Sequence, residues 1–196
     1  MAYDSAATRE RILAAASAEF AEHGVAGARV DRIAANAEAN KRAIYDYFGD
    51  KNRLFAAVLE RLMTDLAAAV PVDGGDLGAY AERLFEYHRD HPEALRLLMW
   101  EALELGDGPV PDEEARTAHY LDKAGAAASA SGDPGTLMLF TLGLVAWPLA
   151  MPQIRRMLLG PDHSLDALRP AIADAVRTLA AREGSAPSAP SAPNAT

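Results

Sequence analysis

The sequence predicts an all-α fold, and three observations lead to this prediction. Apolar residues recur at helical spacing along nearly all of the 196-residue chain. No stretch alternates apolar and polar residues as a half-buried strand would. Clusters of glycine, proline and aspartate interrupt the helical pattern at intervals and supply helix ends. The apolar half of the composition is sufficient to fill a core.

The first quarter of the chain contains three helical patterns, and a fourth follows. The pattern in "TRERILAAASAEFAEHG" stops at Gly24, a residue suited to the position after a helix end. A shorter amphipathic piece follows in "RVDRIAANAE". Asn40 is suited to cap the next helix and Gly49 to end it, which gives a helix of about two turns. Asp50 can cap the longer helix after it.

The segment "PVDGGD" at 71–76 is the expected boundary between two domains. The predicted domains and tail are residues 1–52, with a linking helix over 51–70, then 71–183, and finally 184–196. Within the second domain, the helices are expected at 77–89, 92–105, 113–129, 136–151 and 164–182. The ending "GSAPSAPSAPNAT" repeats Ala, Pro and Ser with nothing to bury, which predicts a disordered tail.

The formal net charge of −9 is distributed unevenly. Residues 1–53 contain eight Lys or Arg against eight Asp or Glu, so the remainder carries the whole negative excess. An acidic total therefore does not exclude a polyanionic partner for the first quarter of the chain, because a local footprint matters more than the sum.

Composition also limits compartment and cofactors. Cysteine is absent, so disulfides and thiolate metal sites are excluded. This is compatible with the cytoplasmic location that we expect but does not establish it. Early charges and a short apolar run do not match a secretion signal. The uncharged stretch from 134 to 154 is long enough to span a membrane, but its prolines and glycines favour a buried helix at an oligomer interface. We expect no membrane contact, cofactor or metal; His88 and His91 lack an obvious third ligand.

The short helix after Asn40 cannot be stable alone, because so few hydrogen bonds do not repay helix nucleation. Ile44 and Phe48 lie four residues apart and give it one apolar face. That orientation turns Lys41 and Arg42 outward, at a helix N-terminus whose free N–H groups favour anions. A helix that enters a DNA major groove by its N-terminal end has these properties.

The same short helix offers other contacts to DNA. Lys41 and Arg42 can reach a guanine edge or a phosphate. Tyr45 and Tyr47 carry hydroxyl groups on rigid rings, and Lys51 lies at the start of the next helix, where a phosphate could bind. These residues alone leave a second reading open, in which this is an ordinary solvated helix end with two tyrosines at the edge of the core.

The wider segment "RERILAAASAEFAEHGVAGARVDRIAANAEANKRAIYDYFGDKNRLF" adds context. A first helix is followed by "HG", then "V..IA..A", then "IYDYF" and a lysine three residues later. As a whole, residues 8–55 resemble the tetracycline-repressor (TetR) family of bacterial transcription regulators. The resemblance implies an N-terminal three-helix helix-turn-helix DNA-binding domain and a helical ligand-binding and dimerisation domain. It also implies site roles, with Lys41, Arg42 and Ala43 facing bases and Tyr45, Tyr47 and Lys51 facing phosphates.

Three positions depart from the family pattern. A threonine usually caps the supporting helix; Ala28 and Arg29 stand there, so a cap of about 1 kcal/mol is lost and Arg29 can reach a phosphate. Glu38 occupies a position in the turn that usually carries glycine, and it is strained if its φ is positive. Arg42 replaces a glycine usual near the start of the recognition helix. The operator sequence of this protein therefore cannot be inferred from those of family members.

Two features of the second domain suggest a partner and a ligand. A seam of Leu165, Leu168, Ile172, Val176 and Leu179, flanked by alanines, is typical of a helix that pairs with another. With the uncharged helix it could form a four-helix interface between two copies, or an intramolecular core. A mostly apolar pocket for a small effector is expected between the middle helices. Its predicted lining is Tyr87, His88, Trp100, Leu103, Glu104, Tyr120, Phe140 and Trp147, although each aromatic could simply fill the core.

The sequence therefore favours a homodimeric, ligand-responsive repressor that binds a palindromic operator in double-stranded DNA and is released by a small, largely apolar effector. An all-helical ligand-binding or interaction module without operator binding is the alternative. An enzyme is not expected, because no nucleophile stands near a suitable base and the carboxylates resemble solvated faces.

Overall fold

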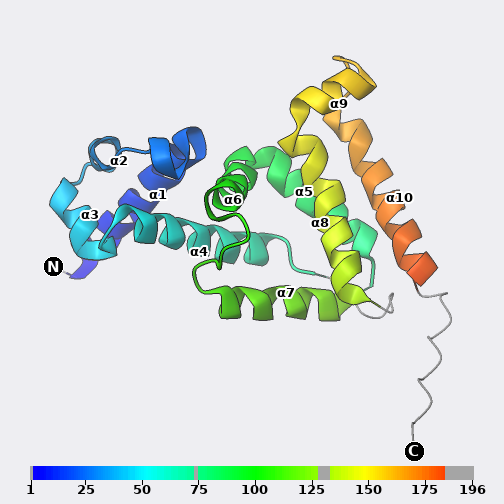
Figure 1. The fold of residues 1–196 in the computed structure, drawn as a ribbon, viewed down its shortest axis with the longest axis horizontal. Coiled ribbons are helices and arrows are strands. Elements are labelled where there is room, and N and C mark those ends of the chain that lie inside the picture. Colours follow the sequence, from blue (N-terminus) through cyan, green and yellow to red (C-terminus); the bar gives the residue numbers. More distant parts are fainter. Residues whose placement is uncertain (1, 73–74, 128–132, 184–196) are drawn as a thin grey trace, which may run out of the picture. The chain divides into compact units, whose positions relative to one another are not determined.

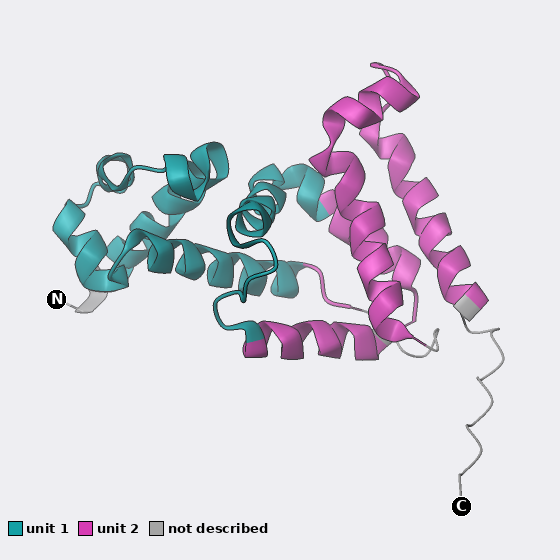
Figure 2. Cartoon of the chain, viewed as in Figure 1, with its two compact units in different colours: residues 1–69, 87–113 teal, residues 70–86, 114–196 magenta. Residues whose placement is uncertain are grey.

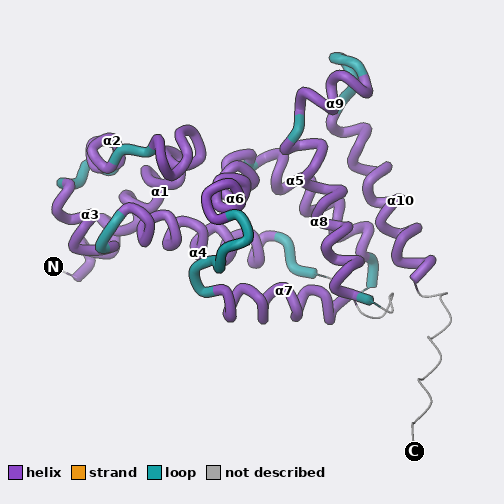
Figure 3. The backbone as a smooth tube through the Cα atoms, in the orientation of Figure 1, coloured by secondary structure: helices purple, strands orange, loops and turns teal. Residues whose placement is uncertain are grey.

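The computed structural model describes residues 2–72, 75–127 and 133–183. These residues form ten helices and no strand, so the all-α prediction is confirmed (Figures 1 and 3). The predicted tail, 184–196, lies outside the described residues. The chain divides into two compact units, which Figure 2 colours separately: residues 1–69 with 87–113, and residues 70–86 with 114–196.

The first unit contains α1 (Ala2–Gly27), α2 (Val30–Asn36), α3 (Lys41–Phe48), α4 (Lys51–Ala69) and α6 (Pro92–Leu105), together with the end of α5 (Leu77–Asp90). Their apolar faces form one core, in which Ile12, Phe20, Ile33 and Leu54 are fully buried. The rings of Phe20 and Phe55 pack edge to face with centroids 5.1 Å apart. This core fixes the short helices α2 and α3 on α1 and α4.

The predicted helix end at Gly24 is present as a sharp break inside α1. Gly24 has φ 67° and ψ 177°, and the helix resumes for one short turn to Gly27. Trp100 of α6 covers this break: its Nε1–H donates to the Ala21 carbonyl at 3.3 Å. Leu97 of α6 is also fully buried in the core. The helix α6 therefore packs directly on α1.

The second unit contains most of α5 together with α7 (Glu113–Ala127), α8 (Pro134–Ala150), α9 (Pro152–Leu159) and α10 (Leu165–Glu183). Within it, α8 packs against α10. Ile172 and Val176, at the centre of the predicted seam on α10, are buried within this single chain. The centre of the seam therefore lies in an intramolecular core, which was one of the two arrangements that the sequence allowed.

The uncharged stretch is divided between two helices. Met151 ends α8, and Pro152 starts α9, a helix that the sequence analysis did not predict. No single helix in the described residues is long and apolar enough to cross a membrane. The bent pair of α8 and α9, which meet at 83°, passes that test by length and composition only.

Candidate nucleic-acid interface

The short helix α3 begins and ends where the sequence predicts. The Asn40 side chain accepts a hydrogen bond from the Ala43 N–H at 2.7 Å, which caps the helix. At the other end, Gly49 has φ 82° and its N–H donates to the Tyr45 carbonyl at 2.8 Å. The Asp50 carboxylate then accepts from the Arg53 N–H at 2.8 Å and caps α4.

The apolar face of α3 is held in the core, as predicted. Ile44 is 1% exposed and Phe48 is 7% exposed. The Arg9 guanidinium of α1 lies over the Phe48 ring, 5.2 Å from its centroid. These contacts compensate for the poor intrinsic stability of so short a helix and fix which of its sides faces outward.

The two cations at the N-terminal end of α3 are exposed, and each has a nearby carboxylate. Arg42 has 89% of its side chain exposed and lies 3.7 Å from Asp46, one turn along the same helix. The Lys41 ammonium lies 3.0 Å from the Asp31 carboxylate of α2, and this hydrogen bond raises the pKa of Lys41. Lys41 therefore stays charged, and a phosphate approaching it would compete with Asp31.

The other predicted contact residues surround this end of α3. Tyr45 and Tyr47 are exposed by 43% and 38%, so both rings have a solvent-facing edge. Ala43 is half-buried. Lys51 points its ammonium at the carbonyls of Ala26 and Ala28, at 3.5 and 3.4 Å. These long contacts place a third cation near the start of α2.

The start of α2 has a cap that the sequence analysis missed. Arg29 occupies the N-cap position without a side-chain capping bond, as expected from the missing threonine. Instead, Glu19 of α1, which is 5% exposed, accepts from the Arg29 N–H at 2.8 Å. The same carboxylate binds Arg32 at 2.8 and 3.0 Å. Arg32 is the main cause that lowers the pKa of Glu19. The Arg29 side chain remains exposed.

In the turn between α2 and α3, Glu38 occupies the position at which the family that this segment resembles usually has glycine. Glu38 has φ 50°, in the left-handed region, so the strain anticipated from the sequence is present. The Glu38 N–H donates to the Ala35 carbonyl at 3.2 Å, and Arg11 of α1 donates to the Ala37 carbonyl at 3.1 Å. The turn is therefore tied to α1 despite the unfavourable residue.

The predicted effector-contacting residues are divided between the two compact units. Tyr87, His88, Trp100, Leu103 and Glu104 belong to the first unit, and Tyr120, Phe140 and Trp147 belong to the second. Trp100 covers the break in α1, and His88 is buried. Leu103, Phe140 and Trp147 are exposed by 73%, 48% and 55%. Glu104 is also exposed, and Tyr120 is half-buried.

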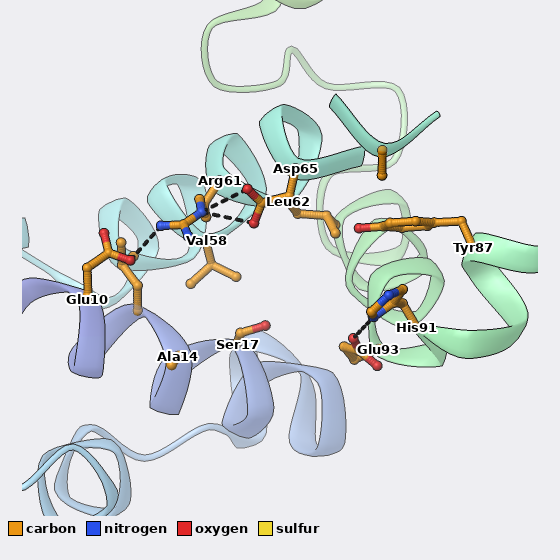
Figure 4. Close-up of a pocket in the computed structure, with 12 residues that line it drawn as sticks. Glu10, Ala14, Ser17, Val58, Arg61, Leu62, Asp65, Tyr87, His91 and Glu93 are labelled. Atoms are coloured by element: carbon orange, nitrogen blue, oxygen red, sulfur yellow. Dashed lines mark hydrogen bonds and ion pairs between the residues drawn. The ribbon is translucent and has the colours of Figure 1, made fainter. Parts of the chain in front are cut away.

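The first unit contains a cavity of about 410 Å³, shown in Figure 4. Its walls come from α1, α4, the end of α5 and the start of α6. Arg61 crosses one side and bonds Glu10 at 2.5 Å and Asp65 at 2.9 Å. On another side, the Tyr87 ring lies 4.6 Å from the His91 ring. Of the predicted effector-contacting residues, Tyr87 lines this cavity. No cluster of three metal-ligating side chains occurs in the described residues.

The helix α3 is short and capped, its apolar face is buried, and its cationic N-terminal end is exposed. Together with the preceding helix α2, this arrangement is typical of a helix-turn-helix protein, which here has further helices attached. Comparisons with known proteins give the family. Residues 12–58 match the description "Bacterial regulatory proteins, tetR family", and residues 76–178 match "Tetracyclin repressor-like, C-terminal domain". The chain belongs to the TetR family of transcriptional regulators, which are not enzymes.

Individual relatives agree with this assignment. The chain is 46% identical to the HTH-type transcriptional repressor SCO4008 of Streptomyces coelicolor, over 92% of this chain and 99% of that protein. It is 35% identical to the HTH-type transcriptional repressor NicS of Pseudomonas putida, over half of each. A crystal structure of the putative transcriptional regulator SCO4942 from Streptomyces coelicolor superposes with a TM-score of 0.74 at 36% identity, covering 88% of this chain and 97% of that one.

Proposed function

We propose that this regulator is a homodimeric, cytoplasmic repressor that binds a palindromic operator and leaves it when a small, largely apolar effector binds. The single observation that carries the proposal is the outward-facing end of α3, where Lys41 and Arg42 are exposed while Ile44 and Phe48 are buried. Base-facing roles then fall to Lys41, Arg42 and Ala43. Phosphate contacts fall to Arg29, Tyr45, Tyr47 and Lys51.

The exposed apolar face of α8 supports the homodimer. Leu139, Phe140 and Trp147 are 66%, 48% and 55% exposed, and α9 adds Met157 and Leu158 at 73% and 77%. So large an apolar surface is costly in water and is typical of an interface. A second copy on this face would supply the second recognition helix that a palindromic operator requires. The names of SCO4008 and NicS as repressors favour repression over activation.

The packing of α6 supports effector-controlled release. This helix falls within the segment matched by the family's C-terminal domain, yet it packs on α1 in the DNA-binding unit through Trp100 and Leu97. An effector that binds better to one position of α6 would shift α1 and the recognition helix with it. The two recognition helices of the dimer would then no longer fit successive major grooves.

Selection of bound sequences from random DNA tests the proposal. A dimer of this kind should recover an inverted repeat whose half-sites are separated by about one helical turn. Its affinity should fall steeply as salt rises, because cations on the protein displace counterions from the phosphates. Recovery of unrelated sequences, or of single half-sites, would contradict the dimeric readout.

The alternative, a helical binding module without an operator, is favoured by one observation. Both cations at the N-terminal end of α3 already have carboxylate partners, Asp31 and Asp46, which lowers the net positive charge of that surface. A retardation assay with the DNA upstream of the protein's own gene separates the two functions. Only the regulator should retard this fragment at moderate salt.

A further inference from the structure

Within the described part of the second unit, buried polar atoms on α5 and α7 have no hydrogen-bond partner. Tyr80 of α5 is fully buried, and its hydroxyl group has no hydrogen-bond partner. On α7, the Nε2 atom of His119 is also buried without one. Buried polar atoms nearly always have partners, since a buried polar atom without a hydrogen bond loses its hydration and gains nothing in return. Two such atoms in one unit point to a group that the described residues do not provide.

A buried cation lies beside them. Lys123 of α7 is only 8% exposed, and its ammonium is 6.0 Å from the Tyr120 ring centroid. Among the described residues it has no hydrogen bond and no ion pair with a carboxylate. The side chain of Lys123 is therefore largely shielded from water, which disfavours the charge of its ammonium where no counterion is present. Accordingly, burial lowers the pKa of Lys123.

These groups lie close enough to influence one another. His119 and Lys123 are one helical turn apart, and after burial, the charge of Lys123 is the next cause that lowers the pKa of His119. Burial raises the pKa of Tyr80 to about 12, and Tyr120 contributes to that increase. Tyr80 therefore lies within electrostatic range of Tyr120 on α7. The acid next in sequence, Asp122, is exposed.

We infer that Tyr80, His119, Tyr120 and Lys123 form the polar end of the effector site and receive a carboxylate or a similar anionic group on a compact apolar molecule. This inference rests on the proposed release by an effector and names its chemical class. An anion would provide the counterion that Lys123 lacks and accept hydrogen bonds from the Tyr80 hydroxyl and from the Nε2–H tautomer of a neutral His119. An organic cation would instead place a second positive charge beside Lys123.

Three probes with one ring system test this class: 1-naphthoate, 1-naphthamide and 1-naphthylmethylammonium. Binding to the full chain is measured by titration calorimetry for the native protein, Lys123→Met, Tyr80→Phe and a control, Arg156→Met, which removes an exposed cation. The native protein should bind the carboxylate at least about tenfold more tightly than the amide or the amine. Lys123→Met should lose that preference, and Arg156→Met should retain it.

Thermal unfolding separates a binding role from a structural one. Because they remove unpartnered buried groups, Lys123→Met and Tyr80→Phe should leave Tm unchanged or raise it without ligand. A lowered Tm would show that these groups already have partners, and would overturn the inference. Equal binding of the three probes, no binding of the carboxylate, or native-like binding by Lys123→Met would also overturn it.

Operator retardation without probe distinguishes this failure from failure of the proposed function. If the native protein and Lys123→Met both retard the operator while the carboxylate fails to bind, only the anion site is wrong. If the native protein does not retard DNA from its own upstream region, the proposed function is wrong as well.

Discussion

Glu19 holds the N-cap residue of α2, which has no capping side chain of its own. Its buried carboxylate accepts from the Arg29 N–H, in the way that a glutamate inside a capping box serves the N-cap residue. It also holds Arg32 on both oxygens. One side chain of α1 thus fixes the start of the supporting helix, and a loss of its charge should loosen the helix-turn-helix.

Glu19→Gln should lower the free energy of unfolding by about 2 kcal/mol at neutral pH, because the charged acceptor is lost in a buried place. The pKa of Glu19 is lowered in the folded state, so its contribution is fully present above the ordinary value of 4.5 and is lost as pH falls through the folded pKa. The native protein should therefore lose stability over this range more steeply than Glu19→Gln. Urea unfolding at several pH values measures both effects, with the exposed Glu22→Gln as control. Equal slopes for the native protein and Glu19→Gln would contradict this role.

Glu38 carries a backbone strain that a single substitution can remove. Because its φ is 50°, Glu38→Gly should raise the free energy of unfolding by about 0.5–1 kcal/mol. Glu38→Ala removes the same charge but keeps a Cβ, so it should not stabilise. Chemical unfolding of both variants separates backbone strain from charge. Equal stabilisation by both would show that the negative charge was the cause.

The residues of the interface divide into those that local sequence can identify and those that it cannot. Asn40, Gly49 and Asp50 act on backbone within a few residues, so their types and spacing predicted their roles. Glu19 and Asp31 act on residues of another helix. Their partners are set by how the helices pack, which a single sequence does not reveal.

At the scale of helices, α6 packs on α1 at the break that Gly24 makes in α1. A Cβ added to Gly24 would lie 2.9 Å from Trp100 Cε3, and φ 67° with ψ 177° is unfavourable for any other residue. Gly24→Ala should therefore lower the free energy of unfolding by about 2–3 kcal/mol. Gly125→Ala in α7 meets nothing within 4 Å and is the matched control, expected to be neutral or stabilising. Calorimetric unfolding of both variants measures the difference; no loss in Gly24→Ala would contradict the packing described.

The helices show why periodicity located most elements but missed one. Stop signals at Gly24, Gly49 and "PVDGGD", together with the Asn40 cap, separated the first four helices. Within the uncharged stretch, Pro148 lies inside α8, whereas Pro152 occupies the first turn of α9. Proline favours the first turn of a helix and disrupts a helix interior, yet this chain has one at each place, so its presence alone did not tell whether one helix ended or another began.

For the whole molecule, the outward face of α8 predicts the oligomeric state. Trp147→Glu places a charge on that face and should convert the dimer into a monomer with weaker operator binding. Leu103→Glu, on an even more exposed residue of α6, is the control and should remain dimeric. Sedimentation velocity measures both. A Trp147→Glu protein that still sediments as a dimer would move the interface elsewhere.

The effector region could be predicted only in outline. The sequence identified aromatic residues on consecutive helices, but it could not tell which unit each joins. Trp100 packs on α1 in the DNA-binding unit, whereas Tyr120 lies near Lys123 in the second unit. Lys123 itself was not singled out, because a lone lysine in an acidic helix normally faces water. Its burial depends on tertiary packing.

The most direct test of the account is operator binding by Lys41→Ala/Arg42→Ala, compared with Arg96→Ala/Arg182→Ala, a control that removes two exposed cations elsewhere. Both variants should fold and sediment like the native protein. DNase footprinting on the selected operator should show native-like protection by the control and no sequence-specific protection by the α3 variant. A native-like footprint from Lys41→Ala/Arg42→Ala would contradict the claim that the exposed end of α3 reads the DNA.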